Sequence, residues 1–132
     1  REYAARGGLI GKRYPWGDDV SVARVYANYA GIGGKDQWVY CAPVGSFAAN
    51  GYGLYDMAGN VYEWCADWYD SDYYSKSPLR NPRTQFTQLP CVAWGAWNDG
   101  TNFLRVAGRL LNLSTPHLRF FNYGFRCVAG SK

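Results

Sequence analysis

The sequence predicts one α+β domain with a small twisted sheet, few helices and long ordered loops. Its 132 residues suffice for a single domain with a real core, and a hydrophobic fraction of 48% excludes an intrinsically disordered chain. Sixteen glycines recur along the chain, and no amphipathic pattern lasts more than about two turns. Loops, rather than long helices, therefore make up most of the expected structure.

Four stretches have the composition of strands. The aromatic and apolar run Val61–Tyr69 predicts a buried strand, and Cys91–Trp97 predicts a second. Leu104–Leu110 and Tyr123–Ala129 are expected to form the third and fourth. The four together predict one small sheet.

The remaining segments read as a short helix and exposed connections. Arg1–Arg6 is expected to end a helix that Gly7–Gly8 closes. Leu9–Asn50 has loop composition, with a turn at Tyr14–Gly17, and Asp70–Leu89 is a polar excursion interrupted by prolines. Long ordered loops on a rigid base are where binding function usually lies.

Composition excludes several function classes. A net charge of +4 is too small to predict nucleic-acid binding, and the apolar stretches are far shorter than the roughly 20 residues of a membrane span. The four cysteines form no CxxC pair, which argues against zinc ribbons and thioredoxin-like sites. Buried thiols and one or two disulfides both remain open. An aromatic fraction of 18%, much of it Tyr and Trp, is typical of a binding surface.

Two loops offer oxygen ligands of the kind that Ca²⁺ prefers. Asp56 and Glu63 lie seven residues apart around the Gly59–Asn60 turn, where backbone carbonyls can also face inward. Asn28 and Asp36 flank a glycine-rich loop in the same way. Turn capping by these side chains is the alternative interpretation.

Five motifs together resemble the formylglycine-generating-enzyme family, also called the sulfatase-modifying factor family. They keep the order that the family has and span nearly the whole chain: Arg1–Gly8, Tyr14–Asp18, Pro43–Phe47, Asn50–Trp64 and Tyr123–Val128. The resemblance implies a C-type-lectin-like fold for residues 1–132 as a single domain. Family members carry a strand and two helices before the first motif, so we expect the N-terminal part of the family domain to be missing here. A longer precursor or a second chain would supply it.

The resemblance also implies structural Ca²⁺ at both acidic loops. In the family, one site uses side chains that match Asp56 and Glu63 and carbonyls that match Gly59 and Val61. The other site uses side chains matching Asn28 and Asp36 and carbonyls matching Tyr29 and Trp38. All four side chains are present in this sequence.

The catalytic site of the family is not expected here. Formylglycine formation needs two cysteines that bind copper just after the second strand, and the matching stretch Trp94–Arg105 contains none. Since Cu(I) prefers thiolate ligands, we expect neither a catalytic cofactor nor catalytic residues, and no enzyme. The single histidine, His117, is expected to make a surface contact.

The C-terminal stretch has an unusual composition. From Asn98 to Ser131 there is no Lys, Glu, Gln, Met or Trp. Randomising both adenines of the Asn codon AAC gives NNC codons, which encode none of these five residues. This pattern resembles the targets of diversity-generating retroelements, whose variable region ends near a Gly-Phe-Arg motif such as Gly124–Arg126. Residues 98–126 are therefore the predicted variable region.

We expect this region to bind a protein or another macromolecule through an irregular apolar surface. The candidate ligand-binding residues are Asn98, Asp99, Gly100, Thr101, Phe103, Leu110, Leu111, Leu113, His117, Leu118, Phe120 and Phe121. The alternatives are an invariant carbohydrate- or protein-binding module and a divergent enzyme of the family. No signal peptide is visible, so the sequence leaves the localisation unknown, and display on a cell surface or a phage is compatible with it.

Overall fold

The computed structural model describes residues 2–68, 72, 75, 90–111 and 120–127. In chain order its elements are α1 (Glu2–Arg6), the 3-10 helix η1 (Val20–Val22), α2 (Ala23–Tyr26), β1 (Tyr62–Trp68), β2 (Pro90–Ala93), the 3-10 helix η2 (Thr101–Leu104), β3 (Arg109–Leu111) and β4 (Tyr123–Gly124). The predicted small sheet with few helices is confirmed.

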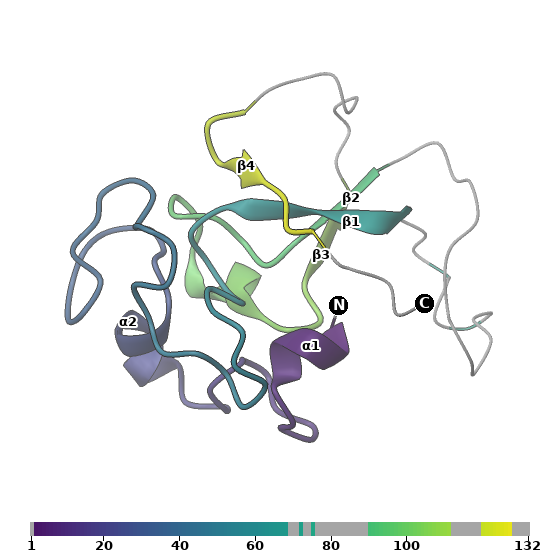
Figure 1. The fold of residues 1–132 in the computed structure, drawn as a ribbon, viewed down its shortest axis with the longest axis horizontal. Coiled ribbons are helices and arrows are strands. Elements are labelled where there is room, and N and C mark those ends of the chain that lie inside the picture. Colours follow the sequence, from purple (N-terminus) through teal and green to yellow (C-terminus); the bar gives the residue numbers. More distant parts are fainter. Residues whose placement is uncertain (1, 69–71, 73–74, 76–89, 112–119, 128–132) are drawn as a thin grey trace.

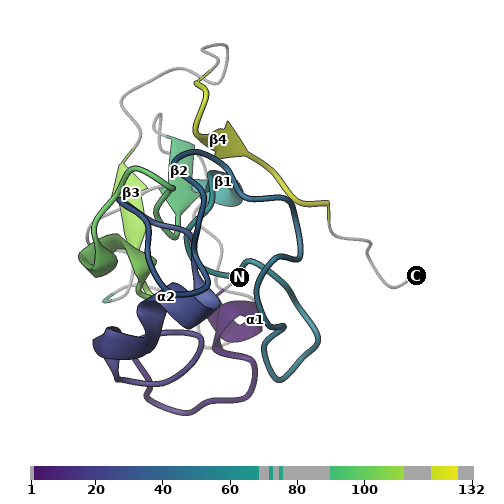
Figure 2. The ribbon, with the colours of Figure 1, turned by 90° about the vertical axis from the view of Figure 1, so that its left-hand side faces the viewer.

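The four strands form one mixed sheet in the order β3-β2-β1-β4. The central strand β1 pairs antiparallel with β2, where Glu63 lies opposite Ala93, and parallel with the edge strand β4, where Glu63 lies opposite Gly124. Strand β3 continues the sheet antiparallel to β2. Both helices lie below the sheet in two perpendicular views (Figures 1 and 2).

The predicted strands agree with the structure to different degrees. The buried strand at Val61–Tyr69 is confirmed by β1. The second strand is shorter than predicted, because Trp94 adopts a positive φ of 73° and turns the chain out of the ladder. Of the predicted fourth strand only Tyr123–Gly124 is paired among the residues described.

The prediction of a strand over Leu104–Leu110 was wrong for most of its length. Leu104 ends η2, and the ladder begins only at Arg109. A turn closes between Arg105 and Gly108, whose N–H donates to the Arg105 carbonyl at 2.9 Å. Local hydrogen bonding therefore overrides the strand propensity of this apolar stretch.

The helix at the N-terminus and the first turn are as predicted. Gly7 and Gly8 end α1 with φ of 56° and 91°. Tyr14 and Gly17 exchange backbone hydrogen bonds of 2.9 and 3.1 Å. The segment predicted as loop also contains η1, whose first turn is capped by the Asp19 carboxylate.

The predicted excursion Asp70–Leu89 lies outside the described residues, except for two exposed positions at 72 and 75. None of the helices in the described ranges is long and apolar enough to cross a membrane.

Among the described residues, three small clusters form the core. The first joins α1 to one side of the sheet through Ala5, Met57, Ala93, Trp94 and Val106. The second lies around α2 and η2 and contains Tyr14, Ala23, Ala27, Ala58 and Leu104. The third contains Tyr62, Val92 and Ala96, with Trp64, Leu110 and Tyr123 packed against it. This third, aromatic-rich cluster is the base of the site described next.

Candidate ligand-binding face

Three aromatic side chains, which we call the aromatic row, meet beside the third core cluster. The row consists of Tyr40, Trp97 and Phe121. The ring centroids are 4.9 Å apart between Tyr40 and Trp97 and 5.8 Å apart between Trp97 and Phe121. Tyr40 is 68% exposed and Phe121 is 76% exposed. Large apolar groups in such exposed positions are characteristic of binding surfaces.

Trp97 is fixed by the turn that follows β2. Its N–H donates to the Asn60 carbonyl at 2.8 Å. The Asp99 carboxylate accepts a 2.7 Å hydrogen bond from Ala96 N–H and closes the turn. The indole Nε1 of Trp97 is buried, and no acceptor among the described residues reaches it. These hydrogen bonds fix the backbone at the centre of the row, and the indole N–H at its base has no acceptor among the described residues.

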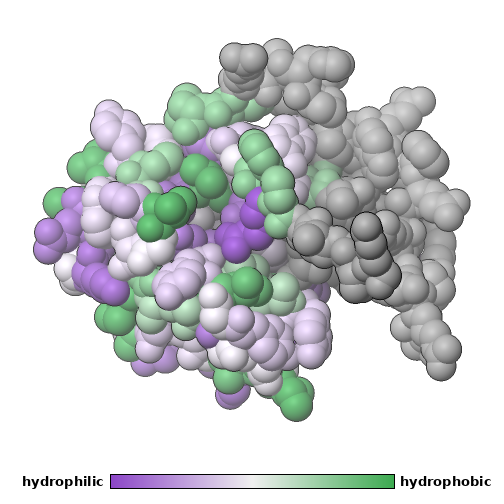
Figure 3. Space-filling model, in the orientation of Figure 1, coloured by the Kyte–Doolittle hydropathy of each residue, from purple (hydrophilic) through white to green (hydrophobic). Residues whose placement is uncertain are grey.

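Phe120 extends this surface towards the sheet. Its ring lies 4.9 Å from that of Tyr123, which in turn packs 5.5 Å from Trp64. Phe120 itself is 38% exposed. Apolar and polar residues alternate over the face of the molecule that Figure 3 shows, and several apolar residues gather at the top of that view.

Tyr62 anchors the base of this face. Burial, together with a hydrogen bond to the Asp99 carboxylate, raises the pKa of its hydroxyl. Burial and the charge of Asp99 also raise the pKa of Tyr123. Both phenols therefore stay neutral at physiological pH and act as packing and hydrogen-bonding groups, not as bases.

Some of the predicted ligand-binding residues lie beside the aromatic row, and others belong to the sheet or pack against the core. Asn98 is exposed and accepts a 3.0 Å hydrogen bond from Asn122 Nδ2, so it lies beside the row. Leu110 is half-buried and packs against the third core cluster, which indicates a structural role. Leu111 pairs with Cys91 in the sheet.

The predicted residues Gly100, Thr101 and Phe103 belong to η2 and its N-cap. Phe103 is 40% exposed, and its N–H donates to the Gly100 carbonyl at 3.1 Å. The predicted residues Leu113, His117 and Leu118 lie outside the described residues.

Sequence reasoning missed the two members of the row that lie before residue 98. Trp97 is expected only as the end of the second predicted strand, and Tyr40 lies in the loop-like segment Leu9–Asn50 with no predicted role. Tyr40 is separated from Trp97 by 57 residues of sequence, and no local pattern connects them. Their proximity depends on the loop at Asn28, whose Nδ2 donates to the Tyr40 carbonyl at 2.7 Å.

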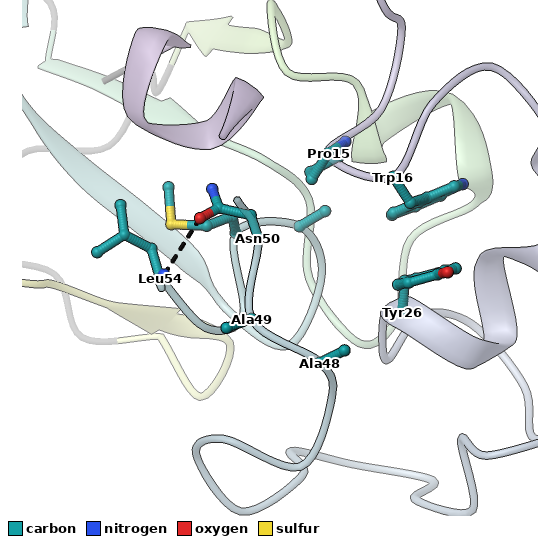
Figure 4. Close-up of a pocket in the computed structure, with 9 residues that line it drawn as sticks. Pro15, Trp16, Tyr26, Ala48, Ala49, Asn50 and Leu54 are labelled. Carbon is teal, nitrogen blue, oxygen red and sulfur yellow. Dashed lines mark hydrogen bonds between the residues drawn. The ribbon is translucent and has the colours of Figure 1, made fainter. Parts of the chain in front are cut away.

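A hollow lies beside α2, and its lining includes Met57 and Ala58 of the loop between Asp56 and Glu63. Pro15, Trp16 and Tyr26 form one wall, and Ala48 and Ala49 face them (Figure 4). The Asn50 amide at its edge is bound to the carbonyl of Ala4. None of its described lining residues carries a charged side chain, so these residues offer little chemistry.

Comparison with known proteins defines the family. The model of the sulfatase-modifying factor enzyme 1-like domain matches residues 1–130. This chain belongs to that family. The formylglycine-generating enzyme of Streptomyces coelicolor is 39% identical over 96% of the chain, which spans 43% of the length of that enzyme.

Two solved structures of similar proteins support the same fold. PvdO from Pseudomonas aeruginosa superposes with a TM-score of 0.74 at 33% identity, over 94% of this chain and 47% of that one. Treponema denticola variable protein 1 superposes with a TM-score of 0.78 at 28% identity, over 94% of this chain and 42% of that one. The expected fold of the formylglycine-generating-enzyme type is confirmed.

The Asn28–Asp36 loop, one of the two calcium loops that the family resemblance implies, contains the guanidinium group of Arg24. Asp36 is fully buried, and its Oδ2 accepts a 2.6 Å hydrogen bond from Arg24. Arg24 also donates to the Tyr29 carbonyl at 2.8 Å. Two of the four predicted ligand oxygens thus already face a cation, while Asn28 Oδ1 is buried without a donor among the described residues. The predicted carbonyl ligand Trp38 follows Asp36 closely, and its N–H lies 3.5 Å from Asp36 Oδ1.

In the Asp56–Glu63 loop, the other predicted calcium site, the carboxylates are arranged differently. Both oxygens of Glu63 pair with Arg126, at 2.5 and 2.7 Å, and this pairing raises the pKa of Arg126. Arg126 also reaches the carbonyls of Tyr55 and Asp56. The predicted carbonyl ligands Gly59 and Val61 are not among its acceptors. Asp56 Oδ1 is buried, and no donor in the described part of the chain reaches it. An unsatisfied buried oxygen of this kind fits a hard cation such as Ca²⁺.

The four cysteines are dispersed over the fold. Cys91 is buried in β2, Cys65 is half-buried in β1, and Cys41 and Cys127 are exposed. Over the described ranges no three His, Cys, Asp or Glu side chains gather within reach of one metal ion. The family nevertheless includes true formylglycine-generating enzymes.

Proposed function

We propose that this chain is a non-catalytic binding domain whose ligand is a protein, contacted by the aromatic row together with the face of residues 98–121. The observation that carries the proposal is the position of Phe120 and Phe121. Both lie within the compositionally restricted stretch and are exposed, and Phe121 packs against Trp97, which in turn contacts Tyr40. Rigid aromatics next to adaptable polar groups such as Asn98 are the mixture found at binding hot spots.

We infer in addition that a retroelement diversifies residues 98–126. The missing residue types between Asn98 and Ser131 support this inference. So does the likeness to a protein named a variable protein, at a TM-score of 0.78. A diversified surface needs a scaffold that tolerates change, and the paired strands β1 and β2, which lie outside residues 98–126, supply one.

Ca²⁺ remains our proposal for the loop between Asp56 and Glu63. The buried Asp56 Oδ1 and the carbonyls of Gly59 and Val61 would hold it, and Glu63 would share its charge with Arg126. In this role the ion pins a loop and supplies no chemistry to a substrate. No catalytic cofactor and no nucleic acid is part of the proposal.

The non-catalytic assignment has a direct test. The purified chain, supplied with Cu(I), is incubated with a cysteine peptide that a formylglycine-generating enzyme converts, and aldehyde is measured with a hydrazide probe. We expect no aldehyde above the peptide blank, since the stretch Trp94–Arg105 has no thiolate to bind copper. The Streptomyces coelicolor enzyme is the positive control. Aldehyde formed by this chain would show that it is an enzyme.

A further inference from the structure

The Arg24 side chain lies at the centre of the loop between Asn28 and Asp36. Its Nη1 donates to the carbonyls of Tyr29 and Gly31 at 2.8 Å each and to Asp36 Oδ2 at 2.6 Å. Its Nη2 donates to the Ala30 carbonyl. One guanidinium therefore binds three consecutive carbonyls and a carboxylate of the same loop.

The loop backbone is shaped around this side chain. A Cβ on Gly31 would come within 3.1 Å of Arg24 Nη2, and a Cβ on Gly34 within 3.2 Å of Arg24 Cβ. Gly34 also has a φ of 57°, which favours glycine. The guanidinium carbon stands 3.6 Å from the centroid of the Tyr29 ring, a cation–π contact. The arginine is consequently enclosed by the loop.

Charge balance requires a cation at this place. Asp36 has no exposed surface, and a buried carboxylate without a counter-charge is strongly destabilising. Converging carbonyls add partial negative charge, as they do around a hard metal ion. Arg24 satisfies both needs with a single planar group that always carries its charge.

We propose that the Arg24 guanidinium takes the place of a metal ion in this loop, so that the Asn28–Asp36 loop folds without Ca²⁺. The proposal disagrees with the calcium ligand set that the family resemblance implies for these residues. It does not extend to the Asp56–Glu63 loop, where Arg126 pairs with Glu63 but donates only to the backbone carbonyl of Asp56 and not to its carboxylate. In the Arg24 loop the buried oxygen without a donor among the described residues, Asn28 Oδ1, is a neutral amide oxygen, whereas in the other loop it belongs to the Asp56 carboxylate.

The loop also supports the candidate binding face, a consequence that rests on the proposed function. Asn28 Nδ2 holds the Tyr40 carbonyl at 2.7 Å, and Ala30 N–H donates to the Asp99 carbonyl at 2.9 Å. Arg24 is therefore a positioning residue for the aromatic row. Its side-chain hydrogen bonds to the described residues go to the loop itself and not to Tyr40 or Trp97.

Amide hydrogen exchange, followed residue by residue by NMR, tests the proposal without any ligand. The probes are the N–H groups of Tyr29, which donates to Asp36 Oδ2, and of Asp36, which donates to the Gly33 carbonyl. In the natural chain we expect their exchange rates to agree within about twofold between excess Ca²⁺ and excess EDTA. In Arg24→Gln we expect both to exchange at least about tenfold faster, because the buried carboxylate has lost its charge partner.

Arg13→Gln is the matched control, since Arg13 is an exposed arginine whose replacement leaves the loop untouched. Slower exchange of Tyr29 and Asp36 in Ca²⁺ than in EDTA in the natural chain would overturn the proposal, and so would unchanged exchange in Arg24→Gln. If Arg24→Gln does not fold, the comparison of Ca²⁺ with EDTA in the natural chain decides alone. Because no binding partner enters the experiment, its outcome is independent of the proposed ligand-binding function.

Discussion

Replacing Phe120 and Phe121 together by alanine is expected to abolish ligand binding and to leave thermal stability nearly unchanged. Phe121 is 76% exposed and its ring lies 5.8 Å from that of Trp97, and Phe120 is 38% exposed. Truncating exposed side chains costs a fold little, about 0.5 kcal/mol or less. Truncating hot-spot aromatics lowers affinity by about tenfold or more.

Peptides selected from a random phage-displayed library on the natural chain serve as ligands, and their affinities are compared by calorimetry. Tyr3→Ala is a close control, because Tyr3 is also 76% exposed and packs 5.4 Å from one other aromatic ring, that of Tyr52, away from the row. This control should bind the peptides as the natural chain does. Unfolding of the double variant would instead identify Phe120 and Phe121 as core residues, and unchanged affinity would remove the row from the binding face.

Gly59→Ala is expected to destabilise the domain by at least about 3 kcal/mol. Gly59 has a φ of 74°, and a Cβ there would lie 2.2 Å from the Asn28 carbonyl oxygen. That carbonyl already accepts a 2.9 Å hydrogen bond from Asn60 N–H, so it cannot move away without breaking the junction of two loops. Urea denaturation measures the loss.

Gly53→Ala separates the steric effect from the backbone effect. Gly53 has nearly the same φ, 72°, but no atom lies within 4 Å of its added Cβ. The expected cost at Gly53 is therefore only that of the left-handed conformation, about 1 kcal/mol. Equal losses in the two variants would contradict the close contact between Gly59 and Asn28.

Local sequence signals predicted the parts of the fold that depend on local chemistry. The aromatic run of β1, the glycines that end α1 and the Tyr14–Gly17 turn all follow from neighbouring residues. The wrongly predicted third strand shows the limit. The apolar stretch after Leu104 resembles a strand, but a hydrogen-bonded turn at Arg105 delays the ladder to Arg109.

The candidate site was predictable only in its C-terminal half. Phe120 and Phe121 were noticeable as apolar residues without helical or strand period, whereas Tyr40 reaches the face through the Asn28 side chain. The contacts of Arg24 could not be predicted from the sequence either. The spacing of Asn28 and Asp36 indicates which oxygen atoms come together, but it does not indicate which cation they bind. A pattern of oxygen-bearing residues therefore predicts a site for a cation without showing whether the cation is a metal ion or an arginine side chain.

Sequencing of this gene across a natural population of its host tests the central claim most directly. If residues 98–126 form a diversified binding face, most amino-acid differences between copies will fall in codons 98–126. These differences will fall at the first and second positions of NNC codons, where the Asn codon AAC carries its two adenines. The codons of the scaffold motif Asn50–Trp64 will remain constant. Differences spread evenly over the gene, or confined to codons outside 98–126, would contradict a retroelement-diversified binding protein.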